Sequence, residues 1–330
     1  MENPVRKTTI FVVKNARDVK INRKAIKELA RDWAKNGIEK SLWPENFHLQ
    51  TKDQQKLLDY LIILDALNFC FWPARIATRS VAGGSKKQRW QIKYKGKKYN
   101  GYYALSLALK KFFEDNPEKA DLYYLSKISF ADFKNILQGG KNLLFLKKRW
   151  QIARTAAKSI IKNYGGSKKF VESANHKFCL LTHKICKELP GFNDIFSYQG
   201  KKIYLLKRAQ ILCSEIWGAF KGKGIGYFED LDYLTCFPDY KIPQILNFLG
   251  ILEYSERLNK KIKNKVLIPM GSLQELEIRS ATVQAVEILK KELKARGQDM
   301  PAFQLDWILW NKSKKDKMKN HYHLTKTIFY

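Results

Sequence analysis

The sequence has few cysteines, and their spacing does not indicate a cross-linked or metal-bound fold. Five cysteines are spread along 330 residues, at positions 70, 179, 186, 213 and 236. An odd number without a Cys-x-x-Cys pair argues against both a disulfide framework and a zinc knuckle. No other cluster of metal ligands stands out. We therefore expect buried thiols and an activity that needs no metal and no cofactor.

Long hydrophobic runs are also missing. The first 19 residues contain an apolar run of only four, which is too short for the apolar region of a signal peptide. The most apolar segment, residues 203–220, is interrupted by Lys207 and Arg208 and does not suit a membrane span. We therefore expect a cytoplasmic protein that does not interact with membranes.

Acidic residues are scarce relative to basic ones. The chain has 62 Lys and Arg against 31 Asp and Glu, a net charge of +31. Such a charge attracts polyanions, so a nucleic-acid partner is one interpretation. However, 49 of the basic residues are Lys and only 13 are Arg, and they are spread over the whole chain. Base readout and bidentate phosphate recognition favour Arg, so the shortage of Arg weakens the nucleic-acid interpretation. A general preference for Lys, or a small anionic substrate such as a nucleotide phosphate, explains the charge equally well.

The hydrophobic pattern predicts a mainly α-helical protein with a minor β-hairpin. Hydrophobic residues make up 45% of a chain with only 9 Pro and 18 Gly, which is typical of a packed globular protein. No internal repeat or regular strand–helix alternation is present. We expect one domain over residues 1–330, with two lobes at about 1–140 and 141–330 as an alternative. Helices are expected at 22–35, from 53 to about 66, and at 101–115, 129–137, 143–164, 168–188, 203–219, 241–252 and 272–296.

Strands and caps follow from shorter patterns. Alternating residues at 88–100, with Lys95-Gly96 as the turn, predict the hairpin. Residues 8–13 and 321–330 are expected to be extended. Thr51 or Asp53, Ser129 and Ser272 are candidate helix N-caps, the last with Glu275 as its capping-box partner.

The segment 228–244 concentrates acids and aromatics in an otherwise basic chain. It contains Glu229, Asp230, Asp232 and Asp239 among several Phe and Tyr residues. A carboxylate among aromatic rings is partly desolvated, which suits acid, base or nucleophile chemistry. Asp239 also lies close before a predicted helix, where acids serve as caps. The spacing leaves both interpretations open.

Three further segments have side chains suited to a nucleotide. Lys207 and Arg208 lie at the start of a predicted helix, where they form either a phosphate or carboxylate partner or a solvated face. The segment 68–72 (NFCFW) offers Phe69, Phe71 and Trp72 for base stacking, or simply forms core. His48 is either a hydrogen-bond donor to a substrate or a structural histidine.

Several of these segments together resemble the queuosine salvage protein family, the queuosine 5′-phosphate N-glycosylases/hydrolases. The resemblance rests, in order, on five segments, and it extends from about residue 10 to the C-terminus. This sequence has Pro238 and Lys241 where the family usually has Ala and Arg, and the second change removes a planar fork of donors. The five segments are NFCFW at 68–72, KRAQIL at 207–212, LTCFPDYKIPQIL at 234–246, EIRSATVQAVE at 277–287 and DWILW at 306–310.

The resemblance implies a helical fold related to helix-rich DNA glycosylases and release of queuine from queuosine 5′-monophosphate. It implies Asp239 as the catalytic carboxylate and Lys207 as its neighbour in the active site. A carboxylate suits this reaction because cleavage of an N-riboside builds positive charge on the sugar. The candidate substrate-binding residues are His48, Phe69, Phe71, Trp72, Phe228, Asp232, Tyr240, Gln244 and Asp306.

Two other classes of function compete with this one. A DNA or RNA glycosylase fits the charge and the implied fold, and a non-enzymatic RNA-binding protein fits the charge alone. The family resemblance and the shortage of Arg favour a small nucleotide as the partner. We expect a monomer that takes this nucleotide and no nucleic acid.

Overall fold

The structure is a computed structural model, and it describes residues 2–39, 43–73, 89–316 and 318–330. Within these residues it has fourteen α-helices and three small antiparallel two-stranded sheets. The prediction of a mainly α-helical fold with a minor hairpin is confirmed. No helix in the described part of the chain is long and apolar enough to cross a membrane.

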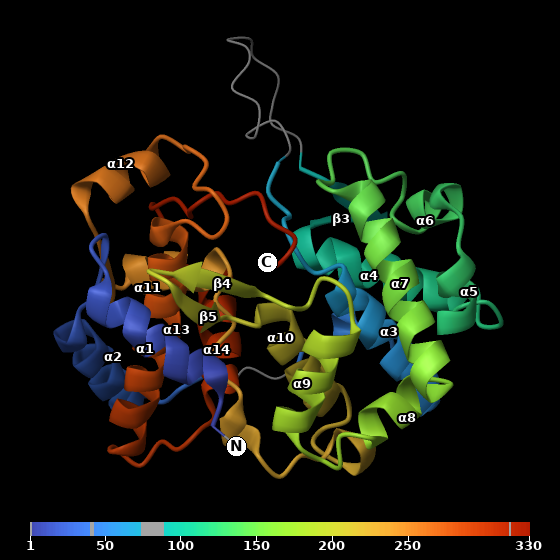
Figure 1. Cartoon of the computed structure of the whole chain (residues 1–330), viewed down its shortest axis with the longest axis horizontal. Coiled ribbons are helices and arrows are strands. Elements are labelled where there is room, and N and C mark those ends of the chain that lie inside the picture. Colours follow the sequence, from blue (N-terminus) through green and yellow to red (C-terminus); the bar gives the residue numbers. More distant parts are fainter. Residues whose placement is uncertain (1, 40–42, 74–88, 317) are drawn as a thin grey trace.

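One group of elements, on the right of Figure 1, is built from residues 54–188. Its centre is α3, which contacts α4, α7 and α8, and α7 packs in turn along α5 and α6. The β2–β3 hairpin packs on α4. The bounds are α3 Gln54–Ala66, β2 Gln91–Tyr94, β3 Lys97–Asn100, α4 Gly101–Asp115, α5 Leu122–Lys127, α6 Phe130–Ile136, α7 Leu146–Tyr164, α8 Ser167–Glu172 and α9 Phe178–Glu188.

The other group joins the beginning of the chain to its end, on the left of Figure 1. Helix α13 contacts α1, α2, α11 and α14, and strand β1 pairs with β6. The bounds are α1 Pro4–Asn15, β1 Val19–Ile21, α2 Arg23–Asn36, α11 Lys241–Phe248, β6 Leu252–Tyr254, α12 Glu256–Lys263, α13 Leu273–Lys294 and α14 Ala302–Lys315.

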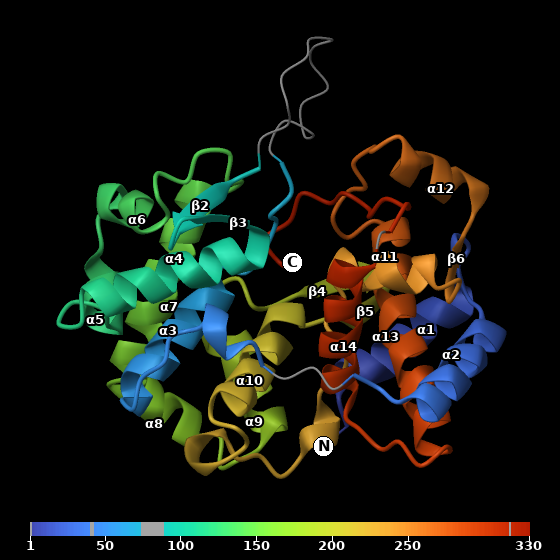
Figure 2. The ribbon, with the colours of Figure 1, turned by 180° about the vertical axis from the view of Figure 1, so that it is seen from behind.

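Helix α10 (Lys207–Ala219) lies between the two groups, as both views of the ribbon show (Figures 1 and 2). It contacts α3 and α9, and the β4–β5 hairpin (Ile195–Tyr198 and Lys201–Tyr204) comes directly before it. One buried apolar cluster contains side chains from both groups and from α10. The helices on either side of residue 140 also pack together, since α7 contacts α3 and α5. The two-lobe division stays a prediction.

Most predicted helix starts and the hairpin are confirmed. The side chains of Asp53, Ser129 and Ser272 each accept a hydrogen bond from a backbone N–H in the first turn of α3, α6 and α13. In the last case Glu275 Oε2 accepts the N–H of Gly271 rather than that of the cap residue. The hairpin turns at Lys95-Gly96 as expected, and its predicted first residue, Gln88, lies outside the described residues.

Three predictions were wrong. Residues 8–13 belong to α1, because Val5, Thr9 and Val12 recur at helical spacing and are buried together. The helix expected at 168–188 is broken between α8 and α9, where Asn175 and His176 adopt positive φ. The closing strand expected at 321–330 is limited to a single bridge between Leu324 and Leu267.

The start of α10 also differs from the prediction. Residues 203–206 were expected to be helical, but 203 and 204 belong to β5 and Leu206 has a φ of 50°. The helix therefore begins at Lys207 itself. This later start places Lys207 in the first turn, where its backbone N–H is not used within the helix.

Candidate functional site

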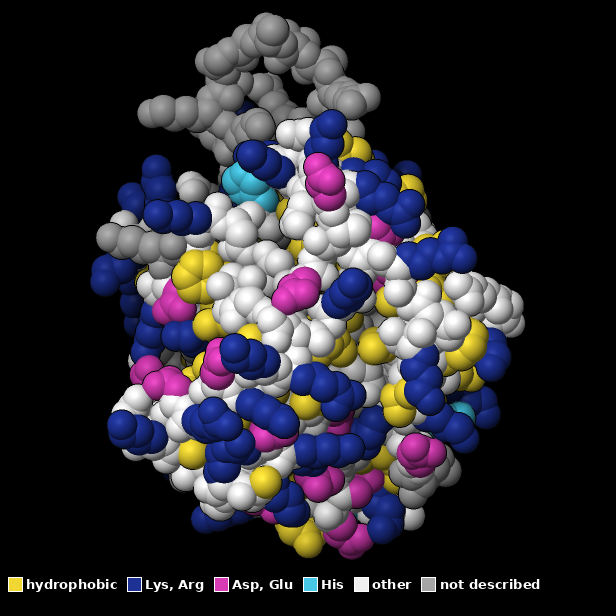
Figure 3. Space-filling view, turned by 90° about the vertical axis from the view of Figure 1, so that its left-hand side faces the viewer, with side chains coloured by type: hydrophobic (Ala, Val, Ile, Leu, Met, Phe, Trp, Pro, Cys, Tyr) yellow, Lys and Arg dark blue, Asp and Glu magenta, His cyan; other side chains and the backbone are white. Residues whose placement is uncertain are grey.

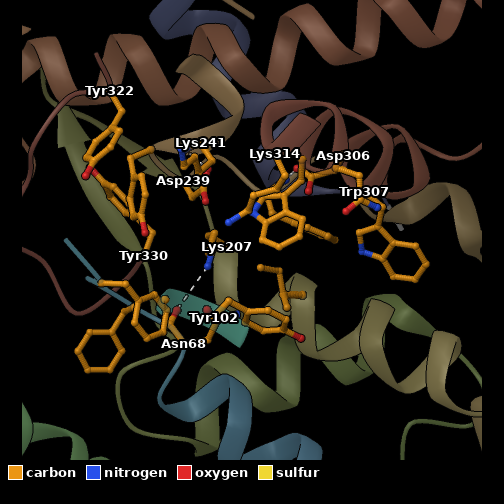
Figure 4. A pocket seen from close by; sticks show the side chains of 18 of the residues that line it. Asn68, Tyr102, Lys207, Asp239, Lys241, Asp306, Trp307, Lys314, Tyr322 and Tyr330 are labelled. Carbon is orange, nitrogen blue, oxygen red and sulfur yellow. Dashed lines mark hydrogen bonds between the residues drawn. The ribbon is translucent and has the colours of Figure 1, made fainter. Parts of the chain in front are cut away.

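A deep cavity lies between the two groups of elements, beside α10. About 1130 Å³ of space lies within it when the solvent at its open mouth is included. Its lining comes from α10, α14, the start of α11, the loop after α3, the start of α4 and the end of the chain. Figure 4 shows Asp239 and Lys241 on one side, Asn68 and Tyr102 on the opposite side, and Lys207 between them.

Lys207 is placed by its position at the first residue of α10. Its backbone N–H donates to Asp194 Oδ2 at 3.2 Å, and its Nζ donates to the Asn68 carbonyl at 3.4 Å. The side chain is only 4% exposed. Burial lowers the pKa of Lys207, and the charges of Asp239 and Asp65 oppose this shift.

Asp239 precedes α11 and caps it, as one of the two interpretations predicted. Its Oδ1 accepts the backbone N–H groups of Lys241 at 2.6 Å and Ile242 at 2.9 Å. Both bonds end on Oδ1, and no donor among the described residues is bonded to Oδ2. Because the carboxylate is half-buried and lines the cavity, its second oxygen is available to a ligand. Capping and chemistry are therefore compatible at this residue.

A buried ion pair connects the segments that carry these two residues. Arg279 on α13 donates to both oxygens of Asp194, at 3.0 and 2.5 Å, and its Nε donates to the Pro238 carbonyl at 2.9 Å. Asp194 also accepts the N–H of Lys207. The Asp194–Arg279 pair thus fixes the start of α10 relative to the loop that holds Asp239. The carbonyl of Pro238, the residue directly before Asp239, takes part in this contact.

A second carboxyl group, that of Glu215, lines the cavity two turns after Lys207 on α10. Its Oε1 accepts a short hydrogen bond from the Tyr102 hydroxyl. Its Oε2 is buried and has no hydrogen-bond partner in the described part of the chain. Burial raises the pKa of Glu215 well above its usual range, and the neighbouring Asp65 contributes in the same direction.

Asp306 on α14 is the third acidic residue of the cavity lining. Its Oδ1 accepts the backbone N–H of Phe237 at 2.8 Å, and the side chain is 5% exposed. Burial raises the pKa of Asp306 well above its usual range, and the charge of Asp239 adds to this effect. Asp306 therefore anchors the segment just before Asp239 and faces the same cavity.

Three cations gather toward the mouth of the cavity: Arg89, Lys241 and Lys314. Lys241 Nζ lies 5.3 Å from the centre of the Tyr322 ring, and Lys314 Nζ lies 4.5 Å from that of Trp310. Lys314 belongs to the cavity lining and is exposed to solvent. Desolvation lowers the pKa of Lys314 to about 8, with smaller effects from the charges of Lys241, Asp239 and Arg89.

Arg208, by contrast, is not available to a phosphate. It is 1% exposed, and its guanidinium donates to the carbonyls of Asp65, Ala66 and Gly191. It also lies 4.9 Å from the centre of the Phe69 ring, while Arg149 lies 4.0 Å from that ring. Arg208 therefore has a structural role in holding the loop after α3.

The aromatic segment 68–72 divides between core and cavity. Phe69 and Trp72 line the cavity but are almost fully buried, whereas Phe71 is half-buried and stacks at 6.5 Å on Trp90. Tyr240, which also lines the cavity, lies 4.9 Å from Tyr322. Further rings in the lining are Trp43, Tyr102, Phe237, Trp307, Trp310 and Tyr330.

Four of the predicted site residues lie outside the cavity lining. His48 is fully buried behind it and contacts Tyr102, and Gln244 bonds to the Asn320 carbonyl and to Lys241. Phe228 stacks on Phe178 with ring centres 4.1 Å apart. Asp232 is exposed and pairs with Lys290 at 2.8 Å. The seven that do line it are Phe69, Phe71, Trp72, Lys207, Asp239, Tyr240 and Asp306.

Sequence reasoning missed several residues that the fold brings to the cavity. Glu215 follows Lys207 and Ile211 at intervals of four, and all three line the cavity from one face of α10. That helical spacing was a usable signal. Arg89 and Lys314 had no such signal, because they lie far apart in a chain that is rich in lysine.

On the one face seen in the space-filling view, the charged side chains are dispersed. On the face shown in Figure 3, Lys and Arg side chains are spread widely and lie beside Asp and Glu rather than in one stripe. Within the described residues, no group of three or more His, Cys, Asp or Glu side chains is arranged to hold a metal ion.

Comparison with known proteins identifies the family. Residues 47–330 match the queuosine salvage protein family. A protein of Sphaerobacter thermophilus is 35% identical over 325 residues, covering 98% of this chain and 96% of its own, and one of Dictyostelium discoideum is 35% identical over 341 residues, covering 99% and 98%. A mouse protein is 28% identical, with 98% of both chains covered. All three are named queuosine 5′-phosphate N-glycosylase/hydrolase. The chain described here belongs to the queuosine salvage protein family.

Proposed function

We propose that this protein hydrolyses the N-glycosidic bond of queuosine 5′-monophosphate and releases queuine for reuse in tRNA modification. The activity in the names of its relatives supports the reaction and the substrate. The observation that carries the proposal is the meeting of Asp239 and Lys207, from distant segments, at one cavity with aromatic walls and a cationic mouth.

The arrangement of polar groups in the cavity suits the parts of a nucleotide. Tyr102, which donates to Glu215, lies on the opposite side from Asp239 and Lys241, with Lys207 between them (Figure 4). We place the base near Glu215, the ribose C1′ beside Asp239 and Lys207, and the 5′-phosphate near the cationic mouth.

Asp239 is proposed to act on the sugar. Breaking the bond to the base leaves positive charge on C1′ and the ring oxygen, and a fixed carboxylate stabilises that charge or attacks C1′ directly. The N–H groups that bond to Oδ1 hold the carboxylate in place. Lys207, whose ammonium interacts electrostatically with Asp239, is proposed to orient the ribose.

Base and phosphate are proposed to bind at opposite ends of the cavity. Aromatic side chains such as Phe71 and Trp307 provide stacking surfaces and exclude water from the reacting bond. Arg89, Lys241 and Lys314 supply charge-assisted hydrogen bonds to the phosphate oxygens. Lys241 stands where the family usually has an arginine. Its ammonium offers one compact charge, whereas a guanidinium could donate two parallel hydrogen bonds to the phosphate.

We further propose that the protein is a monomer, which sedimentation at micromolar concentration tests. We also propose cytoplasmic action and a fold related to helix-rich DNA glycosylases, which an experimental structure can test by superposition.

The experiment is incubation of purified protein with queuosine 5′-monophosphate, with queuine followed by mass spectrometry. We expect release by the wild type and a loss of about 10²–10³-fold or more in Asp239→Asn, which removes the charge and keeps the shape. The matched control is Asp299→Asn, the same change at an exposed carboxylate that pairs with Lys294. Guanosine 5′-monophosphate, duplex DNA and tRNA are the comparison substrates.

The outcomes separate the candidate functions. Release from the free nucleotide but not from duplex DNA or tRNA supports the proposal. Release only from a polymer would replace it with a nucleic-acid glycosylase, and an active Asp239→Asn variant would remove Asp239 from the mechanism.

A further inference from the structure

Glu215 differs from the other carboxyl groups of the cavity in what its oxygens contact. Asp239 and Asp306 each use one oxygen to accept backbone N–H groups. Glu215 accepts a tyrosine hydroxyl at Oε1 and has a buried Oε2 without a partner among the described residues. A buried polar atom without a partner is costly and calls for an explanation. Of the seven such side-chain atoms in the described residues, Oε2 of Glu215 is the one carboxyl oxygen whose residue lines the cavity.

A chain of hydrogen bonds holds Glu215 in place. Tyr60 Oη lies 3.2 Å from His48 Nδ1, and Tyr102 Oη lies 3.4 Å from His48 Nε2. With the ring hydrogen on Nε2, His48 donates to Tyr102 and Tyr102 to Glu215 Oε1, while the single hydroxyl hydrogen of Tyr60 is shared between His48 Nδ1 and the Ser106 carbonyl at 3.3 Å. Each member then donates once, and the carboxylic proton of Glu215 belongs on Oε2, the oxygen without a partner.

The surroundings favour the protonated form of Glu215. The side chain is 5% exposed, and the fully buried Asp65 lies near it. Burial raises the pKa of Asp65 to about 7, so two carboxyl groups share a space with little water. Lys207 and the Tyr102 hydrogen bond act in the opposite direction, but burial is the largest effect on Glu215.

We propose that Glu215 is the general acid of the reaction and protonates the leaving base from Oε2. This inference rests on the proposed function. In a 7-deazapurine, a carbon replaces N7, so the usual site for protonating a leaving purine is missing. N3 is the ring nitrogen that keeps an available lone pair, and it lies next to the carbon that carries N9.

The proton balance of the step is simple. The proton on Oε2 goes to N3 as the C1′–N9 bond breaks, and the electron pair of that bond stays with the base, which leaves as a neutral tautomer. Water supplies the hydroxyl group at C1′. Its other proton is released by way of Asp239, and Glu215 regains a proton from solvent before the next turnover.

Two substrates test the role of Glu215. Queuosine 5′-monophosphate needs a protonated leaving group, whereas 4-nitrophenyl β-D-ribofuranoside 5-phosphate releases a stable nitrophenolate. General acid catalysis typically contributes about 10²–10⁴-fold, so Glu215→Gln should lose that much kcat on the nucleotide and stay within about threefold of wild type on the nitrophenyl substrate. The control is Glu172→Gln, the same change at an exposed residue of α8.

Each outcome bears on the proposal. Equal losses on both substrates, a raised KM with unchanged kcat, or no loss would overturn it. If Glu215→Gln does not fold, the wild-type solvent deuterium isotope effect decides: it should be larger on the nucleotide than on the nitrophenyl substrate, and equal effects would overturn the role. A wild type inactive on queuosine 5′-monophosphate would instead contradict the proposed function itself.

Discussion

The carboxylate of Asp194 holds the guanidinium of Arg279 through both of its oxygens, at 3.0 and 2.5 Å, and both side chains are buried. Each partner also forms a hydrogen bond to a different segment of the candidate site. Asp194 accepts the N–H of Lys207, and Arg279 donates to the carbonyl beside Asp239. The relative placement of Lys207 and Asp239 therefore depends on a contact outside the cavity.

We expect Arg279→Met to lower both stability and activity. The change leaves the buried carboxylates of Asp194 and Glu275 without their cation, and breaking a buried pair in this way typically costs about 3–5 kcal/mol. Urea unfolding measures this cost. The control is Lys168→Met, the same kind of change at an exposed lysine that pairs with Glu172. It should change the free energy of unfolding by less than about 1 kcal/mol. Equal effects of the two changes would contradict a structural role for the buried pair.

Lys207→Met should separate activity from stability. The ammonium of Lys207 is buried with one long hydrogen bond to a carbonyl, so a methionine of similar length removes a desolvation cost and fills the same space. We expect unfolding free energy within about 1 kcal/mol of wild type, or higher, together with a loss of queuine release of about 10²-fold or more. Unfolding and turnover measured on one preparation test both parts. A retained activity would remove Lys207 from the site.

Lys314→Gln and Lys241→Gln should affect the phosphorylated substrate selectively. Each removes one cation at the cavity mouth, where we place the 5′-phosphate, and a charge-assisted hydrogen bond contributes about 1.5–3 kcal/mol. The KM for queuosine 5′-monophosphate should rise by about tenfold or more per change, with a much smaller effect on queuosine. Equal effects on both substrates would place the phosphate elsewhere.

The stability cost of His48→Gln should shrink as the pH falls. Burial lowers the pKa of His48 to about 3 from its ordinary 6.5. Below pH 6.5 the unfolded chain therefore binds a proton that the native state does not. The stability from neutral His48 is complete above pH 6.5 and is lost progressively toward pH 3, by at most about 1.4 kcal/mol per pH unit.

The measurement is urea unfolding of wild type and variant at pH 7.5 and pH 5. The difference between them should narrow at the lower pH, whereas the exposed His183→Gln variant should follow the wild type at both. A constant difference for His48→Gln would show that the imidazole is protonated in the native state.

Local patterns predicted the helices that obey local rules. Asp53, Ser129 and Ser272 were correctly identified as caps because a cap contacts only its own first turn. The N-terminal segment was misassigned because its β-branched residues favour strand, while burial of Val5 and Val12 against later parts of the chain favours helix. Tertiary burial of this kind is not visible in a short window of sequence.

The candidate site likewise contains residues that local motifs could identify and residues whose place depends on tertiary contacts. Asp239 and Lys207 could be chosen from their motifs, and the structure brings both to one cavity. The motifs did not indicate which way the side chains of Phe228 and Asp232 point. Both lie outside the cavity lining, Phe228 against Phe178 and Asp232 beside Lys290. Glu215 was overlooked because its importance depends on a tyrosine of α4, more than 100 positions earlier in the chain.

The pairing of the first elements with the last has a consequence for synthesis on the ribosome. Glu277 accepts the N–H groups of Arg17 and Asp18 across about 260 positions, and α1 packs along α13. The first two helices therefore emerge long before their partners exist, and contacts of such sequence separation form slowly. Until α14 has left the exit tunnel, the nascent chain exposes apolar faces that invite aggregation or chaperone binding. Newly made protein should thus acquire activity only after α14 and Tyr330, which both contribute to the cavity lining, have emerged from the ribosome.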